Sequence, residues 1–83
     1  MAVMTQRAEI TEQDIRESLI ARATSYATKA KTSFSAMGIS AVGDSKFLSR
    51  VQNPDIGFNI KTYQKMVEWL DEAERRLQQE TAA

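Results

Sequence analysis

Polar side chains suited to nucleic-acid recognition are concentrated in one short stretch of the chain. They are two cations, two hydroxyls and an amide: Ser45, Lys46, Ser49, Arg50 and Asn53. Such groups make most of the hydrogen bonds between proteins and phosphates or base edges. The guanidinium of Arg50 matches the two acceptors of a guanine, and the amide of Asn53 would match an adenine if the helix extends that far. For Lys46 or Arg50 alone a solvated helix surface is the more common explanation, so it is the whole face that favours nucleic acid.

Two short helices joined by a tight turn must position this face. The sequence predicts them at about residues 33–42 and 45–52. Thr32 or Ser33 can cap the first, because a short hydroxyl accepts a hydrogen bond from a free backbone N–H of the first turn. Gly43 breaks the run, since glycine adopts left-handed angles at little cost, and Asp44 can cap the second helix. Each helix has one small or apolar face: Phe34, Met37, Gly38 and Ala41 in the first, and Phe47, Leu48 and Val51 in the second.

This pattern also occurs in ordinary helical bundles, but it resembles the helix-turn-helix of small phage-repressor-like (Cro/repressor-type) DNA-binding regulators. Gly38 stands where that family has a small residue at the crossing of the two helices. Leu48 stands at the apolar anchor of the second helix, and Val51 one turn later. The family often places glycine first in the turn with an apolar residue after it, whereas here Val42 precedes Gly43.

The resemblance implies a sequence-specific DNA-binding transcriptional regulator of a phage, plasmid or other mobile element. The second helix of the motif would enter the major groove of double-stranded DNA. Its outward residues would then face the bases and the adjacent phosphates. Four residues ahead of the motif would approach the DNA backbone beside it: Lys29, Lys31, Thr32 and Ser33.

The distribution of charge agrees with this hypothesis although the net charge is zero. Residues 21–65 carry seven basic and two acidic side chains, a net charge of +5, whereas the two ends of the chain are acidic. Attraction of phosphate depends on a local patch, because salt screens each charge beyond about 8–10 Å. The neutral total and the acidic ends leave an alternative open. This alternative is a small helical protein-interaction module that binds and blocks another regulator.

The rest of the chain predicts two longer helices in a single all-α domain of four helices. Thr11 and Asp14 have the spacing of a capping box ahead of a helix over about 12–29. Pro54 and Gly57 indicate a loop over 52–58, from which Ile56 and Phe58 are expected to pack back onto the core. Asn59 can cap a long C-terminal helix over about 60–78. The domain is therefore expected at residues 11–79, with a flexible N-terminus at 1–10 and a tail at 80–83.

The last helix is longer than covering the motif requires, which predicts a homodimer. Proteins of this kind usually bind as pairs to half-sites about 34–36 Å apart. The candidate interface residues are Trp69, Met66 and Leu77. The alternative for Trp69 is packing within its own subunit, because most tryptophans are largely buried.

Composition argues against several other classes of function. The chain has no histidine and no cysteine, which removes the usual general base, the usual nucleophile pairs and most transition-metal ligands. The sequence therefore predicts no enzyme, no metal and no cofactor. No apolar run approaches the ~20 residues of a membrane span, and the first residues lack the apolar core of a signal peptide. A cytoplasmic location without membrane attachment is expected.

Overall fold

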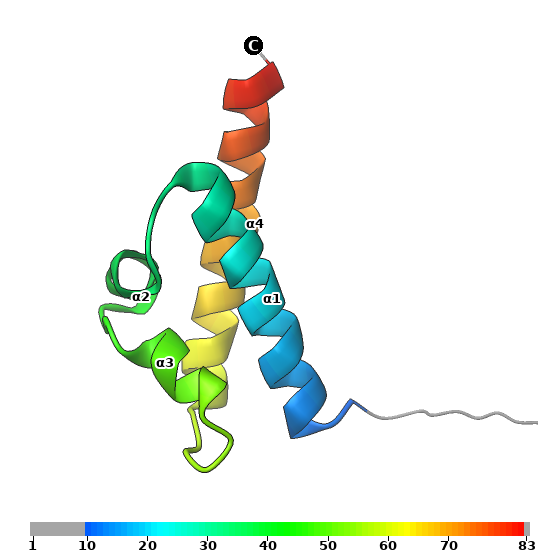
Figure 1. The fold of residues 1–83 in the computed structure, drawn as a ribbon, viewed down its shortest axis with the longest axis vertical. Coiled ribbons are helices and arrows are strands. Elements are labelled where there is room, and N and C mark those ends of the chain that lie inside the picture. The colour runs from blue at the N-terminus through cyan, green and yellow to red at the C-terminus, as the bar shows by residue number, and fades with distance from the viewer. Residues whose placement is uncertain (1–9, 83) are drawn as a thin grey trace, which may run out of the picture.

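A computed structural model describes residues 10–82 of the chain as four helices and no strand (Figure 1). The helices are α1 (Glu12–Ala30), α2 (Phe34–Val42), α3 (Phe47–Gln52) and α4 (Ile60–Ala82). The expected all-α, four-helix class is confirmed. The flexible N-terminus expected at 1–10 lies outside the described residues, apart from Ile10.

Local capping explains where α1 begins and ends. The Thr11 hydroxyl accepts a hydrogen bond from the Asp14 backbone N–H, and the Asp14 carboxylate accepts one from the Thr11 N–H, both at 3.1 Å. This is the predicted capping box. The helix ends at Lys31, which adopts the left-handed conformation with φ 56° and donates its N–H to the Ala27 carbonyl. Such a C-cap stops the helix and satisfies one of its last carbonyls.

The turn between α2 and α3 is longer than the sequence predicted. The Ser33 hydroxyl caps α2 by accepting the Ala36 N–H at 3.1 Å, and Gly43 ends it with φ 72°. Helix α3 starts at Phe47, two residues later than expected, and the prediction that Asp44 is its N-cap is wrong. Asp44 instead accepts the Lys46 N–H at 2.9 Å, which closes a local turn ahead of the helix.

Helix α4 begins as predicted and ends later. The Asn59 side-chain oxygen accepts hydrogen bonds from the backbone N–H groups of Lys61, at 2.7 Å, and Thr62, at 3.3 Å. The rings of Phe58 and Tyr63 pack across this cap with centroids 6.0 Å apart, as a hydrophobic staple does.

The tail expected at 80–83 is wrong for residues 80–82, because α4 continues to Ala82. The helix-forming residues Gln78, Gln79 and Glu80 lead into this stretch, and no glycine or proline is present there to stop the helix.

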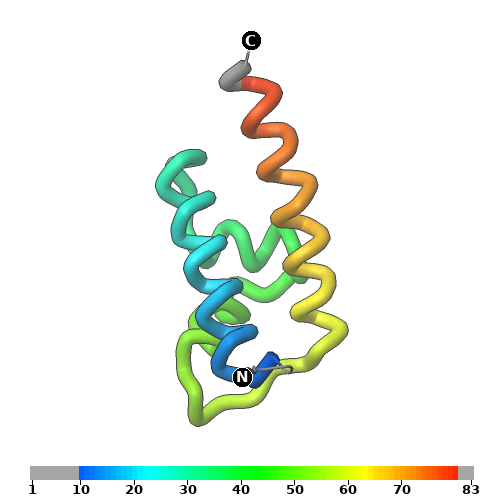
Figure 2. Tube along the Cα trace, turned by 90° about the vertical axis from the view of Figure 1, so that its right-hand side faces the viewer, coloured from blue at the N-terminus to red at the C-terminus, as the bar shows by residue number. Residues whose placement is uncertain are grey.

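The two long helices run in the same direction, and the shorter pair lies across one side of them (Figures 1 and 2). All four helices contribute to one core, which therefore fixes α3 relative to the long helices. Its buried members are Leu19, Ala23, Met37, Phe47, Leu48, Val51, Met66 and Leu70.

Of the two apolar residues in the loop before α4, only Phe58 packs onto the core as expected. Phe58 packs edge-on against Phe47, with ring centroids 6.3 Å apart. The prediction that Ile56 packs onto the core is wrong, since 41% of its surface is exposed. The loop turns the Ile56 carbonyl towards α1, where Arg16 binds it, and leaves the Ile56 side chain outside.

Gly38 allows α2 to approach the turn that follows it. A Cβ atom at this position would lie 2.2 Å from the carbonyl oxygen of Asp44. The Gly38 carbonyl in turn accepts the Asp44 N–H at 3.2 Å. A small residue is needed at position 38, as the sequence indicated. The group that approaches it closely is the backbone of the turn and not the second helix of the motif.

We expect Gly38→Ala to destabilise the protein by about 1–3 kcal/mol, because overpacking outweighs the ~1 kcal/mol that alanine gains in a helix. Gly57→Ala is the matched control, since nothing lies within 4 Å of its added Cβ. The control should be neutral or stabilising by at most about 1 kcal/mol. Urea unfolding followed by circular dichroism measures both, and equal free energies for the two variants would contradict the close approach at Gly38.

Candidate nucleic-acid interface

Helix α3 divides its residues cleanly between the core and the surface. Phe47, Leu48 and Val51 are almost completely buried. Lys46 and Ser49 are exposed, and Ser45 and Arg50 are partly exposed. The structure thus brings these four predicted residues to the outer side of the turn and α3. Side chains three or four positions apart are neighbours on a helix surface, so they form one polar strip.

Arg50 is held by a carboxylate that the sequence analysis had assigned only to capping. Its Nη1 donates to Asp44 Oδ2 at 2.6 Å. The bond from Arg50, and then the Lys46 backbone N–H, hold the pKa of the Asp44 carboxyl below its usual range. Asp44 therefore stays ionised and neutralises one of the two cations of the strip.

Asn53 does not belong to the outward face of α3, so its predicted pairing with adenine is corrected. The residue is the C-cap, with extended backbone angles. Its side-chain oxygen accepts the Asp55 N–H at 3.0 Å, because a proline-containing turn follows α3 directly. Gln52 is the exposed amide that lies within the helix. Its spacing of three from Ser49 and six from Lys46 is the signal that would have identified it.

The residues predicted to flank the motif lie at the junction of α1 and α2. Lys29 and Lys31 are exposed, and Thr32 is partly buried. The Ser33 hydroxyl oxygen is occupied as the cap of α2. Lys29 and Lys31 both line hollows between α1 and α4. Lys31 is the C-cap of α1 and lies two residues before the N-cap of α2, so it is the nearer of the two cations to α2 along the chain.

Two of the seven cations in the basic stretch are paired on folding, Arg50 with Asp44 and Arg22 with α4. Arg22 binds Asp71 and Glu74 of α4, and hydrogen bonds from Glu74 and then Asp71 raise the pKa of its guanidinium. Five other cations have no ion pair within residues 10–82. They are Lys29, Lys31, Lys46, Lys61 and Lys65. The positive charge available to a partner is therefore carried by lysines in α1, the turn before α3 and the start of α4.

Arg16, for which the sequence predicted no role, is buried and only 3% exposed. Its Nη1 donates to the carbonyls of Arg50, Val51 and Asn53 at 3.2, 2.9 and 2.8 Å, and its Nη2 donates to that of Ile56. Its Nε donates to Glu12 at 2.7 Å. The guanidinium carbon also lies 4.9 Å from the centre of the Phe58 ring, within the range of a cation–π interaction.

Arg16 therefore holds the C-terminal end of α3. The last carbonyls of a helix have no partner within it, and a cation there also complements the helix dipole. The guanidinium supplies donors to these carbonyls and to the loop that follows. A signal was present in the sequence, since Arg16 lies three positions before Leu19 and seven before Ala23, within the apolar stripe of α1.

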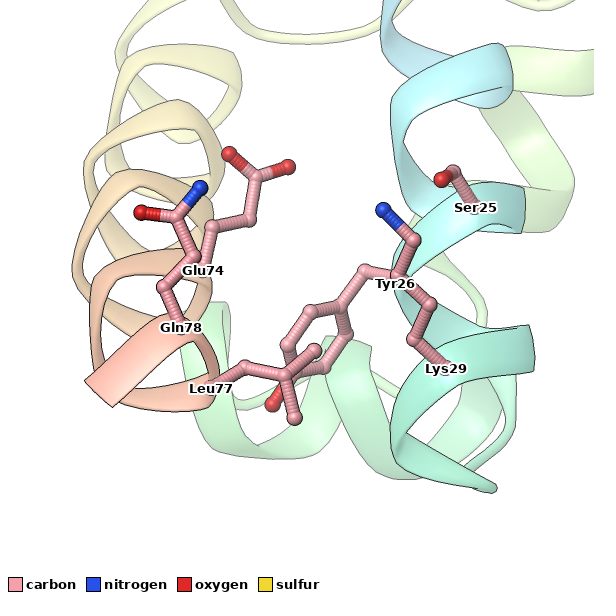
Figure 3. A pocket seen from close by; sticks show the side chains of 6 residues that line it. All are labelled: Ser25, Tyr26, Lys29, Glu74, Leu77 and Gln78. Carbon is pink, nitrogen blue, oxygen red and sulfur yellow. The ribbon is translucent and has the colours of Figure 1, made fainter. Parts of the chain in front are cut away.

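Of the three predicted interface residues, one is corrected. Met66 is fully buried in the core of its own subunit and offers no surface to a second copy. Trp69 packs edge-on against Tyr26, with ring centroids 5.6 Å apart, and remains partly exposed. Leu77 lines a cleft of about 590 Å³ between the C-terminal halves of α1 and α4. Figure 3 shows the Tyr26 ring reaching from α1 across this cleft towards Leu77.

Comparison with known proteins finds no match: no family model, no curated protein and no solved structure is similar to this chain. Within residues 10–82, no helix combines the length and apolar character needed to cross a membrane. The same residues contain no group of three or more acidic side chains arranged to hold a metal ion.

We expect Arg16→Met to destabilise the protein by about 2–5 kcal/mol, because it removes the donors that one buried side chain gives to four carbonyls. The carbonyls of Arg50 and Asn53 keep a backbone N–H partner, so the loss falls mainly on those of Val51 and Ile56. Arg75→Met is the matched control. Its side chain is 61% exposed, so its loss should change stability by less than about 0.5 kcal/mol. Thermal and urea unfolding measure both variants, and equal effects would show that the bonds from Arg16 do not contribute to stability.

Proposed function

We propose that this protein binds DNA in a sequence-specific manner and regulates transcription. The observation that carries the proposal is the division of α3. Phe47, Leu48 and Val51 anchor the helix in the core, which leaves Lys46 and Ser49 exposed on the outer side. Gln52 is exposed at the flank that faces α1, where it lines a hollow with Arg16 and Glu17. Hydroxyl, amide and cationic groups are the side chains that contact phosphates and base edges.

The dimensions of α3 suit a major groove. A helix with its side chains is about 10–12 Å in diameter, and the major groove, about 12 Å wide, admits one. The polar strip of Ser45, Lys46, Ser49 and Arg50 would face the bases. Lys31 would contact a phosphate beside α2, together with the hydroxyls of Thr32 and Ser33. By the resemblance of its helix-turn-helix, the protein would suit a regulator of a phage, plasmid or other mobile element.

The second candidate function is recognition of another regulator by the same surface. Ile39 favours it, because this large apolar residue of α2 is 59% exposed and contributes nothing to a phosphate contact. Binding of a protein would depend on Ile39 and tolerate salt, whereas binding of DNA would depend on Lys46 and weaken steeply with salt.

We expect Lys46→Ala to weaken binding to all duplexes similarly. The slope of log K against log salt should fall by about one, since one phosphate contact is lost. Arg75→Ala removes the same charge from an exposed site on α4 and should leave the slope unchanged. The measurement is fluorescence anisotropy on a duplex selected from randomised oligonucleotides. Undiminished, salt-dependent binding by the Lys46→Ala/Arg50→Ala double variant would exclude α3 from the interface.

We also propose that two copies associate through the cleft between the C-terminal halves of α1 and α4. Leu77 and Trp69 supply partly exposed apolar surface there. The α1 side carries Lys29, and the end of α4 carries Glu80. A two-fold axis would place Glu80 of one copy against Lys29 of the other, and each α3 would remain free for a half-site.

Leu77→Arg should convert this dimer to a monomer and weaken binding to an inverted repeat more than to a single half-site. Ile60→Arg is the matched control, because Ile60 is an exposed apolar residue at the other end of α4. Sedimentation velocity at micromolar concentration distinguishes the two states. A wild-type monomer that stays monomeric on a DNA site without inverted symmetry would contradict the proposal.

A further inference from the structure

The Asp44 carboxylate joins the turn to the polar strip of α3. Its Oδ1 accepts the Lys46 backbone N–H at 2.9 Å, and its Oδ2 accepts Arg50 Nη1 at 2.6 Å. Both oxygens are therefore bound within seven residues of chain. The Arg50 side chain nevertheless remains 42% exposed, and that of Asp44 34% exposed, so a ligand that approaches α3 meets both groups.

The pair leaves part of the guanidinium available in a defined orientation. An arginine has five N–H donors in a planar fork, and Asp44 engages only its Nη1. A free surface arginine samples many rotamers, whereas one held by a carboxylate presents its remaining donors in one direction. Such fixed donors suit the paired acceptors of a guanine edge.

The same carboxylate acts against contacts with phosphate. A phosphate that approaches Arg50 must compete with Asp44 for the guanidinium and is repelled by the Asp44 charge. Binding to DNA of any sequence depends on phosphate contacts, so Asp44 lowers that component. A base edge carries no net charge and is not repelled in this way.

We propose that Asp44 is a specificity-determining residue of the DNA interface, which positions Arg50 for a base and disfavours its use on phosphate. This inference rests on the proposed function. Asp44 acts through Arg50 and contacts no base itself. Asp44 is an acidic residue at the start of the recognition element, which is unfavourable for binding a polyanion. Its proposed role is in discrimination between DNA sequences.

The test compares a selected duplex with an unrelated duplex of equal length for wild type, Asp44→Asn and Asp55→Asn. Asparagine keeps an oxygen for the Lys46 N–H, so the turn is retained, and thermal unfolding checks this. Asp55→Asn removes the same charge from the exposed loop after α3, where the Asp55 carboxylate has no ion pair with an arginine of residues 10–82. For Asp44→Asn the ratio of the two affinities should fall about tenfold, which corresponds to about 1.4 kcal/mol. The unrelated duplex should bind more tightly.

Arg50→Lys provides a second variant that leaves Asp44 in place. Lysine keeps the charge but loses the planar fork, so discrimination should fall while the salt dependence is retained. In the Arg50→Ala background, Asp44→Asn should no longer reduce discrimination at the base that Arg50 contacts.

Three outcomes overturn the inference, and they are distinguishable from one another. An unchanged ratio for Asp44→Asn, with wild type discriminating, overturns the role of Asp44 alone and leaves the proposed function intact. An equal fall in the ratio of the two affinities for Asp55→Asn assigns the effect to net charge. A wild-type protein that binds neither duplex overturns the proposed function and this inference with it.

Discussion

The buried guanidinium of Arg16 is the interaction on which the arrangement of α3 depends. A helix of six residues is too short to be stable alone, so its position must come from tertiary contacts. Phe47, Leu48 and Val51 fix its inner face in the core. Arg16 then binds the carbonyls at its C-terminal end and in the following loop. One side chain of α1 thus orients the helix and the connection to α4.

This anchoring has a consequence for the outer face of the molecule. Because the core and Arg16 satisfy the inner face and the end of α3, the remaining side chains are free to meet a partner. Two arginines of the basic stretch are internally paired, Arg22 with α4 and Arg50 with Asp44. Under the proposed function, the lysines, which keep no carboxylate partner within the described helices, would supply non-specific attraction to DNA. The restrained arginine Arg50 would supply discrimination between sequences.

Much of the fold could be predicted because its signals are local. The capping box at Thr11, the glycine at position 43 and the cap at Asn59 each act within a few residues of the helix end that they set. Arg16 could not be assigned a partner in this way, since its carbonyl partners lie 34 to 40 residues further along the chain. The start of α3 two residues later than expected, and the outward side chain of Ile56, were not predictable for a similar reason. The Asp44 N–H bonds to the Gly38 carbonyl in the turn before α3, and Arg16 binds the Ile56 carbonyl, and both contacts exist only in the folded chain.

The most direct test of the account is a map of the surface that contacts DNA. Backbone amide chemical shifts of the ¹⁵N-labelled protein would be followed by NMR as a selected duplex is added. The account predicts the largest changes from Ser45 to Gln52, smaller ones at Lys31 to Ser33, and none along the exposed face of α4 at Arg75. Changes confined to α4, or no changes at all in low salt, would contradict the assignment of α3 as the DNA-binding helix.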